Sequence, residues 1–471
     1  MENENEKFIW NGIDLEELRK VMDKPSDDAV LSVFEGGANM ESFVAAIKNM
    51  ATNQDYIPSE IPKQMRDFVQ KELALKFTDE DIKYFKQTHE IWLKQGMKFI
   101  FILFFRSLPY TYMAEKPANV LRMTKLLKTH TERRIFETAQ FIFDIMDENW
   151  WTPEKRGILT SLKIRIMHSA MRHIILRTID NPNETDIVTG VWNRIWGNPI
   201  SQEDLIATNQ VFSLEFFKGM EMLGKGLTAK EQKAWYHTLK IIGKIMGVQE
   251  NLLCKEVNEA WSLQHQVYEH LFNDETVAGI PLAKALVETM DQFHLPTRLT
   301  LLMMKKMLAD EQFPDCFNRM LGPSYAEKFP ELFEIHETEE GHALYKKKLQ
   351  GHFHQELKIY YSTLEHQKSK YKSETPHKGW IQKFVDWVMN LFGTSKEEQH
   401  LIDIHIALIH NVLHHPDTGN PREMLDEELI LDAMDAMGGI MISVLNKHYR
   451  GGKNTGFRIP KTLKDNWHLK G

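Results

Sequence analysis

Apolar residues recur at helical spacing along most of this chain, and stretches with the two-residue alternation of a strand are scarce. Helix-start and helix-stop signals separate the periodic stretches from one another. The sequence therefore predicts an all-α fold. Because 471 residues exceed the usual size of a single hydrophobic core, we expect one large domain with extensions, or two domains.

Prolines, glycines and capping residues set the bounds of the expected helices. Ser201-Gln202-Glu203-Asp204 resembles a capping box that opens a helix after the loop 196–200. The polar segment 366–378 is the best candidate for an internal linker. The other expected helices span about 80–105, 118–128, 132–147, 159–177, 229–247, 251–272, 281–292, 339–366, 379–392, 396–415 and 424–449.

Composition narrows the class of protein. A formal net charge of -8 argues against a dedicated nucleic-acid binder, which normally has a basic face. Cys254 and Cys316 are the only cysteines, so a disulfide framework and a cysteine-based zinc site are both excluded. The first seven residues are polar and acidic, and the longest apolar run, 99–105, is too short for a transmembrane helix. We expect a cytoplasmic protein.

The segment around His168 carries the most chemical information. On a helix, Arg165, His168 and Arg172 stand at positions i, i+3 and i+7, so they share one face. An imidazole nitrogen suits iron, and guanidinium groups suit carboxylates such as haem propionates. Taken alone, such a stripe is more often a packed histidine between salt-bridged arginines. These residues by themselves leave both interpretations open.

A second group of polar residues lies about 30 positions upstream. Arg134 and Thr138 are one helical turn apart, and Glu137 directly precedes the threonine. Thr138 is suited to donate a hydrogen bond into a pocket, and Arg134 to pair with a carboxylate. The ordinary alternative is a solvated helix surface on which Thr138 bonds to its own backbone.

In this order and spacing, the two groups resemble a known family. Arg134-x-x-x-Thr138 followed by Lys163-x-Arg165-x-x-His168-x-x-x-Arg172 is similar to the catalytic domain shared by rubber oxygenases (latex clearing proteins) and the MpaB oxygenase. The resemblance covers about residues 90–300. Further matches are Ser107-Leu108-Pro109-x-x-Tyr112, Val120-Leu121-x-x-Thr124-x-x-Leu127, Trp196-Gly197-x-Pro199-Ile200-x-Gln202-Glu203-Asp204-Leu205, Phe212-Ser213 and Leu295-Pro296-Thr297-Arg298.

The resemblance implies a globin-like helical core that holds a non-covalent haem b, with His168 as the axial iron ligand. Arg134, Arg165 and Arg172 would support the haem, and Thr138 would lie in its pocket. Members of this family use O2 to cleave an isoprenoid carbon–carbon double bond. For this chain we therefore expect an oxygenase that acts on a small lipophilic substrate, monomeric by default.

The same resemblance implies three regions along the chain. These are an N-terminal helical extension over residues 1–75, the haem domain over 76–300 and a C-terminal helical region over 301–471. Phe- and Met-rich segments at 97–105 and 301–307 are candidates for a substrate channel, although such segments are more often core.

Two departures from the family's pattern bear on the chemistry. Rubber oxygenases tend to carry a lysine directly before the pocket threonine, whereas this chain has Glu137 there. Their pocket glutamate has no secure match either, since Ala118 falls near the expected position and Glu115 lies close by. Both departures favour an alternative in which the protein binds haem without catalysis, as a carrier or sensor.

A non-haem metal enzyme is the second alternative. Glu339-x-x-His342 and Glu397-x-x-His400 have the Glu-x-x-His spacing of di-iron helical bundles. A histidine-rich segment follows, but steps of five residues on a helix rotate the side chains off a common face. Its members are His400, His405, His410, His414 and His415.

Overall fold

The computed structural model describes residues 8–35, 63–123, 131–152, 154–179, 191–273, 275–292, 295–334, 338–373, 403, 406–415, 418–423 and 425–434. Within these ranges the side chains of 131–136, 292 and 370–373 lie outside the description. The prediction of an all-α fold is confirmed. In the described part, strands form only one short antiparallel hairpin, β1 (Ile9–Trp10) with β2 (Ile13–Asp14).

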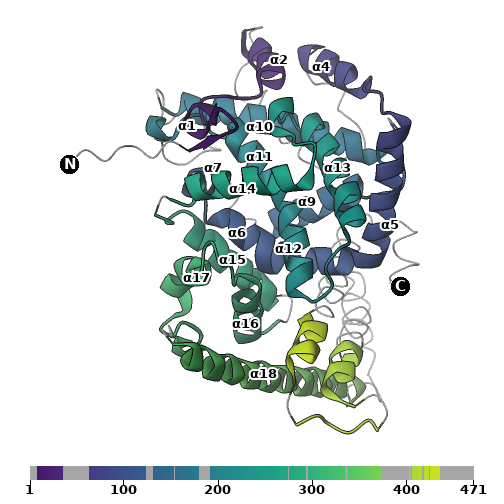
Figure 1. The fold of residues 1–471 in the computed structure, drawn as a ribbon, viewed down its shortest axis with the longest axis vertical. Coiled ribbons are helices and arrows are strands. Elements are labelled where there is room, and N and C mark those ends of the chain that lie inside the picture. Colours follow the sequence, from purple (N-terminus) through teal and green to yellow (C-terminus); the bar gives the residue numbers. More distant parts are fainter. Residues whose placement is uncertain are drawn as a thin grey trace, which may run out of the picture.

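Figure 1 shows the helices of the described residues. They are α1 (Leu15–Leu18), α2 (Lys24–Glu35), α4 (Lys63–Leu73), α5 (Asp79–Ile102), α6 (Leu108–Tyr112), α7 (Glu115–Met123), α9 (Thr131–Ile145), α10 (Arg156–Arg177), α11 (Gln202–Val211), α12 (Leu214–Met222), α13 (Ala229–Ile245), α14 (Val257–Leu271), α15 (Gly279–Gln292), α16 (Thr297–Met307), α17 (Cys316–Tyr325) and α18 (Glu339–Ser373). Short helices also span 406–413 and 427–434.

Local sequence explains where several helices begin. The predicted capping box is confirmed at α11, where the Ser201 side chain accepts from the backbone of Asp204 and the Asp204 side chain accepts from the backbone of Ser201. Thr78 caps α5 in the same way. Side-chain caps of this kind stabilise a helix by about 0.5–2 kcal/mol, so they fix helix starts without help from packing.

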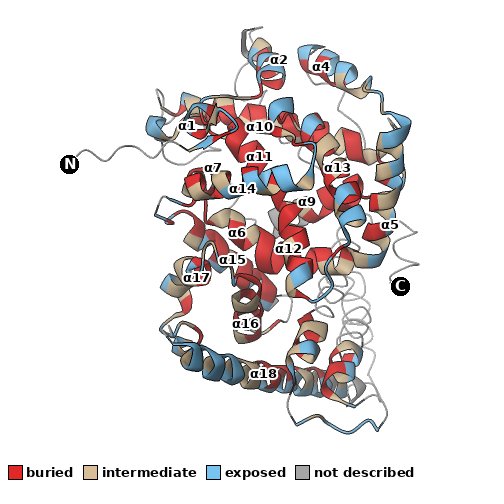
Figure 2. Ribbon diagram, in the orientation of Figure 1, coloured by how far each residue is buried: buried red, intermediate tan, exposed pale blue. Residues whose placement is uncertain are grey.

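One continuous hydrophobic core extends from Trp10 to Met434. The antiparallel helices that pack most extensively are α5 and α13, and α10 contacts both α2 and α9. Buried residues concentrate on the central helices, whereas most of the surface of the long helix α18 is exposed to solvent (Figure 2). The N-terminal and C-terminal regions therefore share a core with the central helices.

The apolar run predicted as a buried helix takes a less regular form. Residues Leu103–Ser107 form a π-helical turn in direct continuation of α5, and all five are buried. Pro109 then lies in the first turn of α6, where a missing amide hydrogen is tolerated. The residues at 99–105 and most of 301–307 are tightly packed core.

Two expected boundaries are wrong. The helix expected from residue 251 begins at Val257, after a 3-10 turn over Glu250–Leu252. The segment 366–378 was predicted as a linker, but α18 continues to Ser373. Polar composition misled the prediction because a surface helix also consists largely of polar side chains. Lys368 on this turn forms a 2.9 Å ion pair with Asp403. The expected helix at 379–392, and parts of those at 396–415 and 424–449, lie outside the described residues.

Among the described residues, no helix has the length and hydropathy required to span a membrane.

Candidate functional site

The helices α9 and α10 carry the six candidate residues that the sequence singles out, which are Arg134, Glu137, Thr138, Arg165, His168 and Arg172. Thr160, in the first turn of α10, donates a 2.7 Å hydrogen bond to Asp144 near the end of α9. Gln140 donates to the same carboxylate at 2.6 Å. A Cβ on Gly157 would lie 2.8 Å from the Asp144 carbonyl oxygen, so this glycine permits the close approach of the two helices.

These contacts fix the register of the hairpin. Glu137 lies seven residues before Asp144, which is two helical turns, so both occupy the same face of α9. His168 lies eight residues after Thr160. At about 1.5 Å per residue the two displacements are about 10 and 12 Å along antiparallel axes. The register therefore brings Glu137 and His168 to the same level of the hairpin.

The face of α10 that carries His168 is packed less completely than the opposite face. We call Ile164, Met167, His168 and Met171 the His168 face; all four are half-buried. On the opposite side, Ile166 and Ala170 are fully buried. Glu137 and Thr138 on α9 are also half-buried. An imidazole thus lies among partly exposed apolar side chains beside a neighbouring helix.

Arg165 points away from the His168 face toward the N-terminal helices. Its guanidinium donates to both carboxylate oxygens of Asp23, at 2.6 and 2.8 Å, and to Glu72 at 3.0 Å. Burial by itself lowers the pKa of Arg165, but the hydrogen bonds and charge of Asp23, with the charge of Glu72, raise it overall. Arg165 therefore links α10 to the segment before α2 and to α4.

Arg172, two turns further along the same side of α10, makes a similar link. It is fully buried and forms a close ion pair with Asp27 of α2. It also donates to the carbonyl oxygens of Pro199, at 3.1 Å, and Ile200, at 2.8 Å. Ile200 has a φ of 54°, a conformation that is rare outside glycine, and the bonds to Arg172 hold it there.

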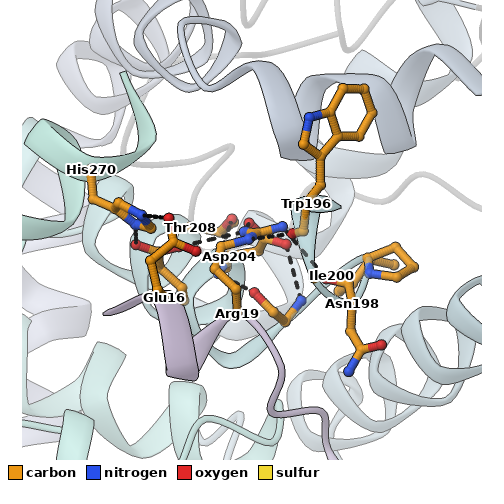
Figure 3. A network of polar contacts seen from close by, with 12 residues as sticks. Glu16, Arg19, Trp196, Asn198, Ile200, Asp204, Thr208 and His270 are labelled. Carbon is orange, nitrogen blue, oxygen red and sulfur yellow. Dashed lines mark hydrogen bonds and ion pairs between the residues drawn. The ribbon is translucent and has the colours of Figure 1, made fainter. Parts of the chain in front are cut away.

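The motif from Trp196 to Leu205 forms a buried polar network next to these arginines (Figure 3). Arg19 donates to the Trp196 carbonyl oxygen at 2.8 Å and forms a close ion pair with Asp204. Gly197 has a φ of 73°, and a Cβ there would lie 2.7 Å from the Arg19 carbonyl oxygen. The motif therefore anchors α1 to the start of α11.

His270 extends this network through two carboxylates (Figure 3). Its Nδ1 lies 2.6 Å from buried Glu203, and its Nε2 lies 2.8 Å from Glu16. Burial alone lowers the pKa of His270, but the hydrogen bond and charge of Glu203 and the hydrogen bond of Glu16 raise it overall. The sequence motif gave no hint of this histidine, which comes from a distant helix.

A cluster around Arg106, which the sequence analysis missed, lies at the π-helical turn. Arg106 donates to Glu215 at 2.7 Å, to Asp310 at 2.9 Å and to the Met307 carbonyl oxygen at 2.8 Å. Its guanidinium also lies 4.9 Å from the centre of the Tyr110 ring. The available signal was a single arginine directly after a seven-residue apolar run.

Three candidate residues from the sequence are left to place in the structure, and they are Arg134, Ala118 and Glu115. The Arg134 side chain lies outside the described residues. Ala118 is buried, and Glu115 accepts 2.7 Å hydrogen bonds from the backbone amides of Val277 and Ala278 at the start of α15. Glu115 thus caps a helix.

The metal ligands of the di-iron alternative are only partly described. Glu339 and His342 are exposed on the first turn of α18, and Glu397 and His400 lie outside the described residues. Ligands of a di-iron bundle project inward, unlike this first pair. Across the described ranges, no group of three or more His, Cys, Asp or Glu side chains is arranged to hold a metal ion.

A shallow cleft of about 470 Å³ opens beside the Arg19 network. The last turn of α10 contributes Leu176, and the following segment contributes Ile179, Trp192 and Ile195 to its apolar wall. Lys20 and Arg194 add cationic groups. The cleft lies toward the C-terminal end of the helix that carries His168.

Comparisons with known proteins agree on one family. Residues 101–329 match the family model described as ER-bound oxygenase mpaB/B'/Rubber oxygenase, catalytic domain. The chain is 21% identical over 280 residues to the rubber oxygenase of Streptomyces sp. (strain K30), a match that covers 57% of this chain and 62% of the relative.

The fold of this chain is also similar to that of a solved structure. The solved structure of latex clearing protein LCP in the closed state superposes with a TM-score of 0.51 at 17% identity, covering 70% of this chain and 90% of that one. The resemblance inferred from Arg134, Thr138, Arg165, His168 and Arg172 is thereby confirmed at the level of the family. Residues 101–329 of this chain are therefore similar to the catalytic domain of the MpaB/rubber-oxygenase family.

Proposed function

We propose that this chain is a haem-b-dependent oxygenase in which His168 is the axial iron ligand. The observation that carries the proposal is the His168 face, where an imidazole stands among half-buried Ile164, Met167 and Met171 beside α9. An apolar surface with one nitrogen ligand suits a porphyrin held without a covalent link. The match of residues 101–329 to the catalytic-domain model of an oxygenase family supports the same proposal.

Some residues around the His168 face are suited to hold a haem, and others are already bound to carboxylates of the protein. The imidazole and the apolar side chains are suitable, and Arg134 is our candidate partner for a propionate. Arg165 and Arg172 instead direct their guanidinium groups to Asp23, Glu72 and Asp27. We propose that these two arginines act indirectly, by holding α10 and therefore the His168 ring in position.

When bound, haem b would supply the binding and activation of O2. The chain's own residues would exclude water, align an unsaturated lipophilic substrate and manage protons. Thr138 is the proposed hydrogen-bond donor, and Glu137, at the level of His168 in the hairpin, is the proposed proton acceptor. Oxidative cleavage of a carbon–carbon double bond by one O2 would place one oxygen atom on each of two carbonyl products.

The substrate class follows from the family and from the apolar surroundings. We propose an isoprenoid-like alkene rather than a charged metabolite, because Ile164, Met167 and Met171 make the His168 face apolar. A cytoplasmic location and a monomeric state remain predictions from the sequence.

A haem-binding protein without catalytic activity is the second candidate. The observation that favours it is Glu137, which stands where rubber oxygenases tend to carry a lysine. Haem retained at full occupancy, with no O2 consumption in the presence of unsaturated isoprenoids, would select this candidate.

The first test is an absorption spectrum of the purified protein before and after dithionite, with a pyridine haemochromogen assay. We expect a Soret band and about one haem b per chain. His168→Ala should lose the haem, because neither buried cysteine lies on α10 and no covalent link exists. His173→Gln, a half-buried histidine on the same helix, is the matched control and should keep it. Full haem content in His168→Ala would refute the axial assignment.

A further inference from the structure

The C-terminal part of the chain contains a pair of histidines that the proposed function does not use. His410 and His414 lie one turn apart at the end of the helix 406–413, which packs beside α18 (Figure 1). Their ring centroids are 3.9 Å apart, and the ring planes differ by 12°. Residues four apart share a helix face, so this pair differs from the histidines spaced by five.

One hydrogen bond defines the tautomer of His414. Its Nδ1 lies 3.0 Å from the carbonyl oxygen of His410. Since a carbonyl oxygen can only accept, Nδ1 must carry the hydrogen, and in the neutral ring Nε2 then carries the lone pair. A metal-ligating histidine commonly donates its other ring N–H to a backbone carbonyl in the same way.

The backbone around the pair is well braced. After His414 the chain turns back, and Arg422 donates its backbone amide to the Leu413 carbonyl oxygen at 2.8 Å. His415 donates its amide to the Asn420 carbonyl oxygen at 2.9 Å. On the other side the Tyr361 ring of α18 lies 5.9 Å from the His410 ring and 5.7 Å from the His414 ring. Both imidazoles are thus held on an ordered, half-buried surface.

We propose that His410 and His414 form a two-histidine site for a borderline divalent transition-metal ion. In this proposal Nε2 of His414, whose ring is held by the bond from Nδ1, and one ring nitrogen of His410 would bind the same ion, and water would fill the remaining positions. Imidazole nitrogens favour Cu²⁺ over Ni²⁺ and Zn²⁺, whereas Mg²⁺ and Ca²⁺ require oxygen ligands.

The surroundings set limits on this site. No third His, Cys, Asp or Glu among the described residues joins the pair in a metal-binding cluster. The Arg422 guanidinium donates to the His414 carbonyl oxygen at 3.3 Å, so a positive charge lies close by. Two ligands and a nearby cation give a weaker site than a closed structural zinc centre. Bound metal would stabilise the helical turn that joins His410 to His414, because both ligands lie on it.

The test is Cu²⁺ binding to the full-length protein without an affinity tag, followed by titration calorimetry and by electron paramagnetic resonance. Because the chain has 21 histidines, the comparison is made between variants rather than on total copper uptake. His410→Gln removes one ligand. His414→Asn removes Nε2, while its side-chain amide can still donate to the His410 carbonyl oxygen. His415→Gln, at the exposed neighbouring position, is the matched control.

We expect the wild type and His415→Gln to bind one Cu²⁺ in the tightest class with two nitrogen ligands. His410→Gln and His414→Asn should each weaken that class at least about tenfold and lose one nitrogen coupling, with unchanged circular dichroism. The wild type should bind Cu²⁺ more tightly than Ni²⁺ or Zn²⁺. Equal copper affinity in all four proteins, or no copper binding by the wild type, would overturn the proposal.

Discussion

Arg165 offers the sharpest test of how the N-terminal helices support the candidate site. The guanidinium and Asp23 are both almost fully buried, and Glu72 lies partly exposed beside them. Arg165→Met removes the cation and leaves Asp23 in the core without its ionic partner. Breaking a buried ion pair from one side costs about 3–5 kcal/mol.

That free energy corresponds to a measurable change in melting temperature. With an unfolding entropy of about 2.1 cal/mol/K per residue, a single cooperative unit of this length loses about 1 °C of Tm per kcal/mol, so the expected decrease is about 3–5 °C. The assay is thermal unfolding of the haem-free protein, followed by circular dichroism. The double variant Asp23→Leu with Arg165→Met is the control, and it should recover most of the loss because apolar groups replace both charges.

The haem content of the same variants separates two roles for Arg165. If the arginine braces α10, Arg165→Met lowers the Tm of the haem-free protein, and the double variant restores both the Tm and haem occupancy. If it instead contacts a propionate, haem occupancy falls in both variants while the haem-free Tm stays unchanged. The bracing argument would be refuted if Arg165→Met lowered the free energy of unfolding by less than about 1 kcal/mol. It would also be refuted if the double variant did not recover the lost Tm.

Three further outcomes test the polar networks. The raised pKa of His270 means that its contribution to stability is complete below about pH 6.5 and is lost as the pH rises through the folded-state pKa, so the Tm of the wild type should fall more between pH 6 and pH 9 than that of His270→Gln. Gly197→Ala should destabilise the fold by about 1–3 kcal/mol in thermal unfolding, since it combines a φ of 73° with a Cβ 2.7 Å from a carbonyl oxygen; an unchanged Tm would contradict this. Arg106→Met should cost about 3–5 kcal/mol because it leaves Glu215 buried without its cation, and a stable Arg106→Met protein would show that the π-helical turn holds without the ion pairs.

Local signals in the sequence predicted the helix starts well. The capping box at Ser201–Asp204 was visible because its hydrogen bonds join residues three positions apart. The sequence also predicted the end of α10 at Arg177 and the burial of the apolar run 99–105. The boundary at 366–378 failed because polarity alone does not distinguish a solvated helix from a linker.

The roles of polar residues were harder to predict. The sequence places Arg165, His168 and Arg172 on one side of a helix, but it does not reveal that Asp23 and Asp27, more than 140 residues away, take up the two guanidinium groups. His270 and its two carboxylates come from three separate parts of the chain in the same way.

By itself, the sequence determined the all-α class and the helix caps and showed the resemblance to the family, because periodicity, capping and motif spacing are properties of residues close together in the chain. Only the tertiary structure decided which acids neutralise the buried arginines and which face of α10 stays half-buried. Those outcomes depend on the packing of distant helices, where a buried charge must find its partner through space rather than along the chain.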